Sequence, residues 1–442
     1  MGKLPLLKVT SDRRFLATED NKPFFWLGDT AWELFHRLSR EDSSVYLRDR
    51  SAKGFTVIQA VLLAEIDGLN SPNANGDKPL IDHDPSKPFE SYFQHVDQVV
   101  SMAAGLNLYM ALLPTWGDKW NKAWGQGPEI FTPENARTYG EFLGRRYAGY
   151  SNVIWVLGGD RVPEKESHYQ IIRAMASGIR KHDPVHLMTY HPNGGRIASD
   201  YVGQDDWLDI NMFQSRHQSG FKEYKFTQKA LEARPARPVI DAEPGYENIP
   251  NLLNKWNLKR LDAEDVRRSA YWNMFAGAAG HTYGCNEVWQ MHSPEHQGLF
   301  GAQLHWKEAM QLPGAAQMGY LRRLFESLPW QSMRNEPKLL VRGVLSRFRH
   351  TWAMVSPDKD IILVYSPYGK AFRLKLSVMK EAALTAFWFD PASGQLKKQG
   401  EYSQGHRVKF TPVTKTTGKD HVLLVMGKQA ARNWLQKHGN QV

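Results

Sequence analysis

The sequence predicts a mixed α/β protein, a (β/α)8 TIM barrel followed by a small antiparallel β-sandwich. Two observations predict the barrel: apolar runs alternate with helix-like segments from about residue 24 to 330, and there are eight such runs. A third predicts the sandwich, because after about residue 335 short alternating runs are separated by turn residues. We therefore expect two domains, residues 1–334 and 335–442.

The strands of the predicted barrel are strongly apolar, and helix-like segments separate them. We place the strands at residues 24–29, 56–63, 106–114, 152–160, 186–192, 208–214, 238–244 and 279–287. The amphipathic segments are residues 39–54, 89–105, 132–150, 168–184 and 262–280. Several begin on Ser, Thr or Asp and end on Gly or Asp-Pro, as capped helices do. The rival fold, a doubly wound open sheet, would be favoured by a glycine-rich phosphate loop, and neither GxGxxG nor GxxxxGK[ST] occurs.

The C-terminal part contains short strand-like runs and most of the positive charge. The runs are residues 339–347, 351–357, 361–369, 371–378, 384–394, 406–413 and 421–427, and residues 428–442 read as a tail or short helix. Residues 331–442 hold 19 Lys and Arg against 7 Asp and Glu, a net +12, whereas the whole chain carries +10. Such a domain would be attracted to a polyanion, an acidic polysaccharide or a nucleic acid. A solvated basic surface is the alternative, because the lysines are scattered.

Several function classes are excluded by composition. No apolar run of 18 residues occurs, so we expect no membrane span, and the N-terminus lacks the long apolar core of a signal peptide. The single Cys285 excludes an intramolecular disulfide, and we expect it to be a small buried residue and not a nucleophile. His191, His217 and His281 lack HxH or HExxH spacing, so we expect hydrogen-bonding histidines, no metal and no cofactor.

The reacting groups of a (β/α)8 barrel lie where the strands end, and here those ends carry carboxylates, tryptophans and amides. This mixture fits a carbohydrate, because sugar rings stack on indoles and their hydroxyls bind planar polar groups. Glycoside cleavage needs two carboxyl groups, and we assign Asp160 and Glu243, each at the end of a rigid apolar strand. Asp241 is an alternative to Glu243, since alternation places both on one side of the strand. Arg161 beside Asp160 leaves open which of the pair is the acid.

The other polar and aromatic residues at the strand ends are candidates for binding the sugar. They are Asp29, Trp32, Trp116, Asp118, Trp120, Arg161, His191, Gln214, Arg216, Tyr246, Glu287 and Trp289. For Asp29 the alternative is a helix cap, and for the tryptophans, Trp124 included, it is core packing. The arginines could bind uronate carboxylates or pair on the surface.

Three stretches of the barrel, FFWLGDTAW (24–32), NVIWVLGGD (152–160) and PVIDAEPGYE (238–247), resemble the apiosidase-like glycoside hydrolases of family 140. The stretch TAFWFDPASG (385–394) resembles the collagen-binding-type β-sandwich that follows the barrel in such proteins. The resemblance implies removal of apiose from the galacturonan of rhamnogalacturonan II, a pectin, by a retaining double displacement. Asp160 would be the acid/base and Glu243 the nucleophile. The activity would lie in the periplasm or outside the cell, with a cytoplasmic location as the alternative.

One departure from the broader glycoside hydrolase clan A pattern concerns Gly159, which stands where many members place Asn in W-x-x-G-N-E. The amide that contacts the sugar 2-hydroxyl is missing, so either another residue supplies that contact or the sugar differs from an ordinary pyranose. We expect an oligosaccharide or polysaccharide partner, acidic if the resemblance holds, and no nucleic acid. Three alternatives stay open: a non-catalytic carbohydrate-binding protein, a glucanase or arabinosidase on the same barrel, and a metal-dependent barrel hydrolase.

Overall fold

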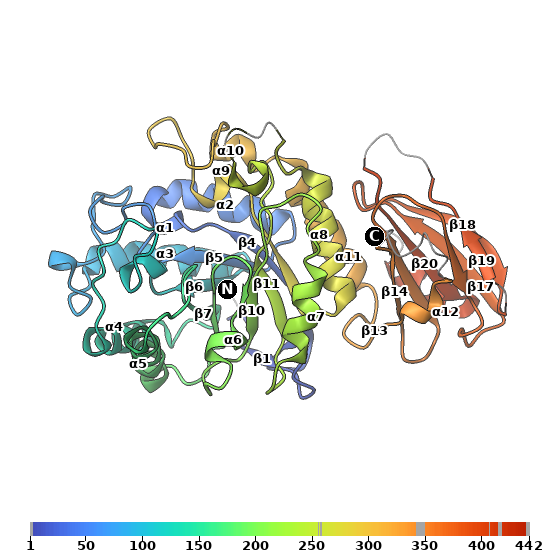
Figure 1. Cartoon of the computed structure of the whole chain (residues 1–442), viewed down its shortest axis with the longest axis horizontal. Coiled ribbons are helices and arrows are strands. Elements are labelled where there is room, and N and C mark those ends of the chain that lie inside the picture. The colour runs from blue at the N-terminus through green and yellow to red at the C-terminus, as the bar shows by residue number, and fades with distance from the viewer. Residues whose placement is uncertain are drawn as a thin grey trace.

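The computed structural model describes residues 3–254, 256, 259–341, 350–405, 407–413 and 418–438. A helix-covered barrel and a smaller all-β domain lie side by side (Figure 1). Before the barrel, β1 (Leu7–Val9), β2 (Leu16–Thr18) and β3 (Pro23–Phe24) form a three-stranded antiparallel sheet that we did not predict. The rings of Phe24 and Tyr109 pack edge to face with centroids 5.1 Å apart, so this sheet lies at the N-terminal end of the barrel strands.

The barrel is built from eight parallel strands, as predicted. In chain order they are β4 (Trp26–Thr30), β5 (Val57–Val61), β6 (Tyr109–Leu113), β7 (Val153–Leu157), β8 (Met188–Tyr190), β10 (Asn211–Gln214), β11 (Val239–Glu243) and β12 (Gly280–Tyr283). β12 pairs with β4, and a parallel bridge between Thr189 and Ile210 joins β8 to β10, which closes the ring. The short β9 (Arg196–Ile197) runs antiparallel to β10.

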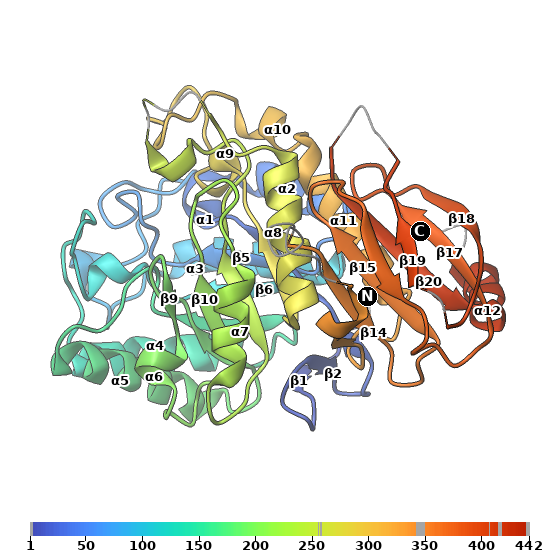
Figure 2. The ribbon, with the colours of Figure 1, turned by 45° about the vertical axis from the view of Figure 1, so that its right-hand side comes forward.

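Helices follow these strands, and the longer ones cover the outside of the barrel (Figures 1 and 2). They are α1 (Leu34–Arg37), α2 (Arg40–Ala52), α3 (Glu90–Gly105), α4 (Pro133–Tyr147), α5 (Glu166–His182), α6 (Ser199–Val202), α7 (Tyr224–Glu232), α8 (Ala263–Ala276), α9 (Asn286–Trp289), α10 (Trp306–Ala309) and α11 (Pro313–Glu326). Thr132 and Asp262 form capping boxes at α4 and α8, where the sequence places helix starts. Across the described residues, no helix is long and apolar enough to cross a membrane.

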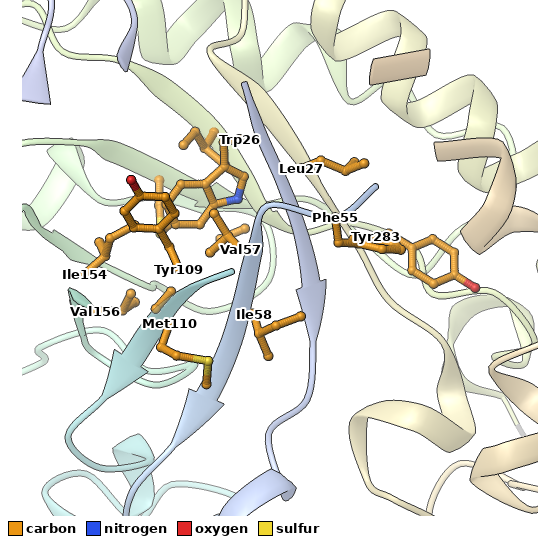
Figure 3. Packing of buried hydrophobic residues seen from close by; sticks show 14 of the residues in the cluster. Trp26, Leu27, Phe55, Val57, Ile58, Tyr109, Met110, Ile154, Val156 and Tyr283 are labelled. Carbon is orange, nitrogen blue, oxygen red and sulfur yellow. The ribbon is translucent and has the colours of Figure 1, made fainter. Parts of the chain in front are cut away.

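The barrel core explains why its strands read as continuous apolar runs. Every residue of β5, β6 and β7 is buried, because one face of each strand points into the barrel and the other packs under helices. Figure 3 shows Trp26, Val57 and Tyr109 gathered among neighbouring strands. This packing gives the strand ends a rigid base.

The C-terminal domain is an antiparallel β-sandwich, as predicted. Its larger sheet has the order β13 (Arg334–Asn335), β14 (Trp352–Val355), β15 (Ile361–Ser366), β20 (His421–Gly427), β17 (Ala383–Phe389) and β18 (Leu396–Ser403), and its smaller sheet pairs β16 (Phe372–Lys375) with β19 (Arg407–Phe410). Most of the strand predicted over 339–347 lies outside the described residues. The exposed edge strand β18 was not predicted because LKKQGEYS is polar on both faces. Lys428–His438 forms α12.

The sandwich packs closely on the barrel. Tyr271 of α8 stacks on Tyr365 of β15 with ring centroids 4.8 Å apart. Beside them Arg267 and Asp420, both buried, form an ion pair of 2.7 Å. One hydrophobic cluster runs from the barrel into the facing side of the larger sheet, so the two domains share a core.

Candidate active site

A cavity of about 520 Å³ lies at the C-terminal ends of the barrel strands. Its wall combines carboxyl groups and other polar side chains with aromatic rings and a few aliphatic side chains. The polar side chains are Glu65, Asp160, Asn193, Gln214, Ser215, Arg216, His217 and Glu243, and the aromatic ones are Trp32, Trp116, Trp124, Tyr246, Trp289 and Phe300. A few convergent polar groups in a largely apolar cleft are typical of a small-molecule site.

Asp160 is presented by a tight left-handed turn at the end of β7. Gly158, Gly159 and Asp160 have φ of 97°, 68° and 58°. A Cβ on Gly158 would lie 2.4 Å from the carbonyl oxygen of His191, and one on Gly159 would lie 2.6 Å from the backbone nitrogen of Gly117. The two glycines are therefore required, and an Asn in place of Gly159 would not fit. Asp160 itself adopts a conformation that costs a non-glycine residue about 1–3 kcal/mol, a strain found at functional sites.

Arg161 holds this turn from behind. Its side chain is only 1% exposed, and its Nη1 donates to the Asp160 carbonyl oxygen at 2.7 Å. The same atom lies 3.2 Å from the Asp160 carboxylate. The guanidinium also lies 4.0 Å from the ring centroid of Trp124. Arg161 thus lies outside the described wall of the cavity and contacts Asp160.

Glu243 ends β11 and is held by two histidines. His191 Nε2 lies 3.3 Å from one carboxylate oxygen and His217 Nε2 lies 3.2 Å from the other. His191 is itself fixed edge-on against Trp32, with ring centroids 5.4 Å apart. Burial alone would raise the pKa of Glu243, but the contacts with both histidines outweigh it and hold that pKa well below its ordinary value. Glu243 is therefore a charged carboxylate.

The pKa of Asp160 is shifted in the opposite direction to that of Glu243. Burial, followed by the negative charge of Glu243, raises the pKa of Asp160 to about 7, although His191, Arg161 and Gln214 favour its charged form. One cavity thus contains a carboxyl group that keeps its proton near neutral pH and a carboxylate that has lost it. Such a pair can supply a proton donor and an anionic nucleophile to the same bond.

Asp241 does not share the position of Glu243, contrary to the expectation from strand alternation. The pairing of β10 with β11 shifts register between Phe213 and Gln214, so Asp241 pairs with Phe213 and Glu243 with Gln214. Asp241 is fully buried and accepts a hydrogen bond from Asn273 Nδ2 of α8 at 3.1 Å. It therefore supports the barrel wall behind the cavity.

Six of the predicted sugar-binding residues line the cavity. They are Trp32, Trp116, Gln214, Arg216, Tyr246 and Trp289. Trp32 Nε1 donates to the Tyr246 hydroxyl at 3.2 Å, which fixes two of the rings against each other. His191 reaches the site through its contact with Glu243 and lies just behind the wall.

Asp29 and Glu287 lie outside the described cavity wall. Asp29 is fully buried, 2.9 Å from Arg50 Nε, and accepts a hydrogen bond from the Tyr46 hydroxyl at 2.5 Å. Glu287 accepts a hydrogen bond from Asn248 Nδ2 at 2.8 Å. The Asp29 carboxylate therefore holds α2 against β4, and the Glu287 carboxylate holds the loop that contains Asn248.

Asp118 and Trp120 stabilise the loop that follows β6 and also lie outside the described cavity wall. Asp118 forms a buried ion pair of 2.8 Å with Lys119. Trp120 is 3% exposed and donates from Nε1 to the Gly158 carbonyl oxygen at 3.2 Å. Trp120 therefore braces the turn that carries Asp160.

The cavity also contains Glu65, Asn193 and His217, which are not among the predicted sugar-binding residues. Glu65 follows β5, and burial, with the charge of Asp160 next, raises its pKa well above the ordinary value. Asn193 and His217 follow β8 and β10. The sequence feature that could have identified His217 is its position next to Arg216, just after a barrel strand. Within the described part of the chain, no group of three or more His, Cys, Asp or Glu side chains is placed to hold a metal ion.

Comparisons with known proteins match both domains. The family described as "Apiosidase-like, catalytic domain" matches residues 10–332, and "Putative collagen-binding domain of a collagenase" matches residues 340–426. A solved structure named glycoside hydrolase is 31% identical with a TM-score of 0.87, covering 96% of this chain and 97% of that one. A glycoside hydrolase family 5 structure from Bacteroides vulgatus is also 31% identical, with a TM-score of 0.89 and coverage of 98% and 96%. No curated protein matches the chain.

Proposed function

Because the chain belongs to the apiosidase-like glycoside hydrolases, we propose that it removes apiose from the galacturonan of rhamnogalacturonan II by a retaining double displacement. The observation that carries the proposal is the pair of carboxyl groups in one cavity with pKa values shifted in opposite directions. We place this activity in the periplasm or outside the cell, where a plant cell-wall polymer would be encountered.

In the first step Asp160 gives its proton to the leaving oxygen while Glu243 attacks the anomeric carbon and the glycosidic bond breaks. The resulting ester removes the negative charge of Glu243, which is a cause of the raised pKa of Asp160. The pKa of Asp160 falls at that stage, so its carboxylate can accept a proton from water. Water then attacks the anomeric carbon and releases Glu243 with configuration retained.

Gln214 and Asn193 are our candidates for the contact that Gly159 does not make. The Oε1 atom of Gln214 and the Oδ1 atom of Asn193 are buried, and neither has a hydrogen-bond partner within the described structure. Both residues line the cavity. Unpaired buried acceptors are costly, and sugar hydroxyls would satisfy them.

The position of Arg216 is an argument for an acidic substrate. It is exposed at the cavity wall, and no carboxylate among the described residues pairs with it. Its guanidinium lies 5.9 Å from the ring centroid of Phe221, which leaves its donors free for a ligand. A planar guanidinium can bind a uronate carboxylate through two parallel hydrogen bonds.

Incubation with rhamnogalacturonan II fragments, followed by identification of the released sugar, tests this proposal. We expect free apiose, and proton NMR of the first-formed anomer should show retained configuration. Release of glucose or arabinose would assign the same carboxylates to another substrate. Affinity for the fragments without any product would instead indicate a non-catalytic binding protein.

A further inference from the structure

The two-stranded sheet of the sandwich carries four basic residues on one face. β16 and β19 are antiparallel, with Arg373 opposite Lys409 and Lys375 opposite Arg407. Residues directly opposite each other in an antiparallel pair point to the same side, and residues two apart along a strand do too. We call these four residues the cationic ribbon face.

This face points away from the rest of the molecule. The alternate residues Phe372, Leu374 and Phe410 are buried against the larger sheet in the core of the sandwich. The opposite side of that larger sheet packs on the barrel, for instance through Tyr365. The ribbon is therefore the outermost layer, and its basic side chains project to solvent, with β19 on the side of the sandwich remote from the barrel (Figure 1).

The cationic ribbon face lacks counter-charges within the described structure, where none of its four side chains has an ion pair or hydrogen bond. Like charges directly opposite in a sheet are unfavourable. Two acidic residues of the domain are already paired elsewhere: Asp420 with Arg267 at 2.7 Å, and Glu401 with Lys398 at 3.1 Å. An external anion would relieve the repulsion.

We propose that the cationic ribbon face binds a polyuronate, a polysaccharide chain bearing a carboxylate on successive sugars. The four basic residues form a repeated array, about 7 Å apart along each strand and about 5 Å apart across the pair. Such an array suits a linear polymer more than a single ion. The guanidinium groups of Arg373 and Arg407 can each bind a carboxylate in a fork. The four basic residues are not interleaved with aromatic side chains on this face, so it lacks the base-stacking platform of single-strand nucleic acid sites.

Polygalacturonate binding by the full-length protein, measured at several salt concentrations, tests the site. For the double variant Arg373→Glu/Lys409→Glu we expect binding at least about tenfold weaker at low salt, and wild-type binding that falls as salt rises. The matched control Lys397→Glu/Lys437→Glu changes the net charge equally at exposed positions on β18 and α12, and its binding should stay within about twofold of wild type. Arg373→Gln/Lys409→Gln removes the charges without reversing them and should also weaken binding.

Three outcomes would overturn the proposal: equal losses in the ribbon and control variants, no binding by the wild type, or tighter binding to duplex DNA than to polygalacturonate at the same salt. Unchanged circular dichroism and melting temperature show that each variant is folded. Hydrolysis of a short pectic fragment should be the same in the ribbon variant and the wild type. If no apiose is released but polygalacturonate still binds, the proposed activity fails and the ribbon site stands.

Discussion

Arg161 donates to the backbone carbonyl of Asp160 at 2.7 Å and lies 3.2 Å from the carboxylate of the same residue. Arg161 therefore fixes the position of Asp160, the proposed proton donor, and also favours the charged form of its carboxyl group, which opposes the raised pKa of Asp160. The residue that made the role of Asp160 ambiguous in the sequence is a positioning residue in the structure.

Removing this cation should shift the pH dependence of turnover. In Arg161→Met the pKa of Asp160 loses a lowering influence, so the alkaline limb of kcat/KM against pH should move to higher pH. Turnover should fall because the turn is less firmly held. Arg161→Lys should return the limb toward its wild-type position. A lower rate with an unmoved alkaline limb would contradict an electrostatic role.

The pH profile of the wild-type enzyme should be bell-shaped. Asp160 must hold a proton for the first step, so activity declines as pH rises through its pKa of about 7. Glu243 must be ionised, so activity also declines as pH falls toward its depressed pKa. Initial rates from pH 3 to 9 on one substrate measure the alkaline limb, because the acid limb lies near the Glu243 pKa of about 2. A rate still rising above pH 8 would exclude Asp160 as the acid.

Replacing either member of the pair should strongly reduce or abolish turnover without unfolding the protein. We expect Asp160→Asn to reduce kcat by about 10²–10⁴-fold, the range of general acid–base catalysis. Glu243→Gln should leave no measurable hydrolysis. The matched control is Asp241→Asn, because Asp241 is a buried structural carboxyl outside the described wall and an amide can still accept from Asn273. Near-wild-type activity in Glu243→Gln would remove Glu243 from the mechanism.

Asp160→Asn should also change stability in a pH-dependent way. A carboxyl group whose folded pKa is raised stabilises the fold at low pH and loses that contribution as pH rises through the folded pKa, about 7 here. Asn does not ionise, so the variant should melt at a higher temperature than wild type at pH 8, and this advantage should shrink at pH 4. Asn tolerates the left-handed backbone as Asp does, so the substitution adds no backbone strain. Equal melting temperatures at pH 8 would argue against the raised pKa.

Trp124 should recognise the leaving group. It is 62% exposed, lines the cavity, and has Arg161 4.0 Å from its ring centroid, close to the proton donor. In Trp124→Ala we expect KM for a saccharide leaving group to rise by about two- to tenfold, the worth of one stacking contact. Hydrolysis of apiosyl fluoride, whose leaving group is a single atom, should be unaffected. Equal losses on both substrates would place Trp124 in a structural role.

Much of the fold could be predicted because the local pattern of apolar and polar residues agrees with their burial in the structure. The barrel strands are buried on both faces, so their apolar runs are continuous, and Thr132 and Asp262 mark helix starts that the structure confirms. The edge strand β18 could not be predicted because neither of its faces packs in a core. The first three strands are too short for alternation to reveal them.

The site could be predicted only at the level of strand ends. Glu243 and Gln214 line the cavity as expected. Asp29 instead contacts Arg50 of α2, and Glu287, which lies in α9, contacts Asn248. The direction in which such a side chain points depends on partners distant in sequence, such as Arg50 for Asp29. The register shift that separates Asp241 from Glu243 leaves no mark in the order of residues.

Arg267 and Asp420 form a buried ion pair between the two domains, and the stacked rings of Tyr271 and Tyr365 lie beside it. The sandwich is therefore a structural part of the barrel and not a separable domain. Cutting the chain after α11 would expose aromatic rings on α8 and remove Asp420, the counter-ion of the Arg267 guanidinium. The two domains should therefore melt as one cooperative unit, with a single calorimetric transition for the whole chain.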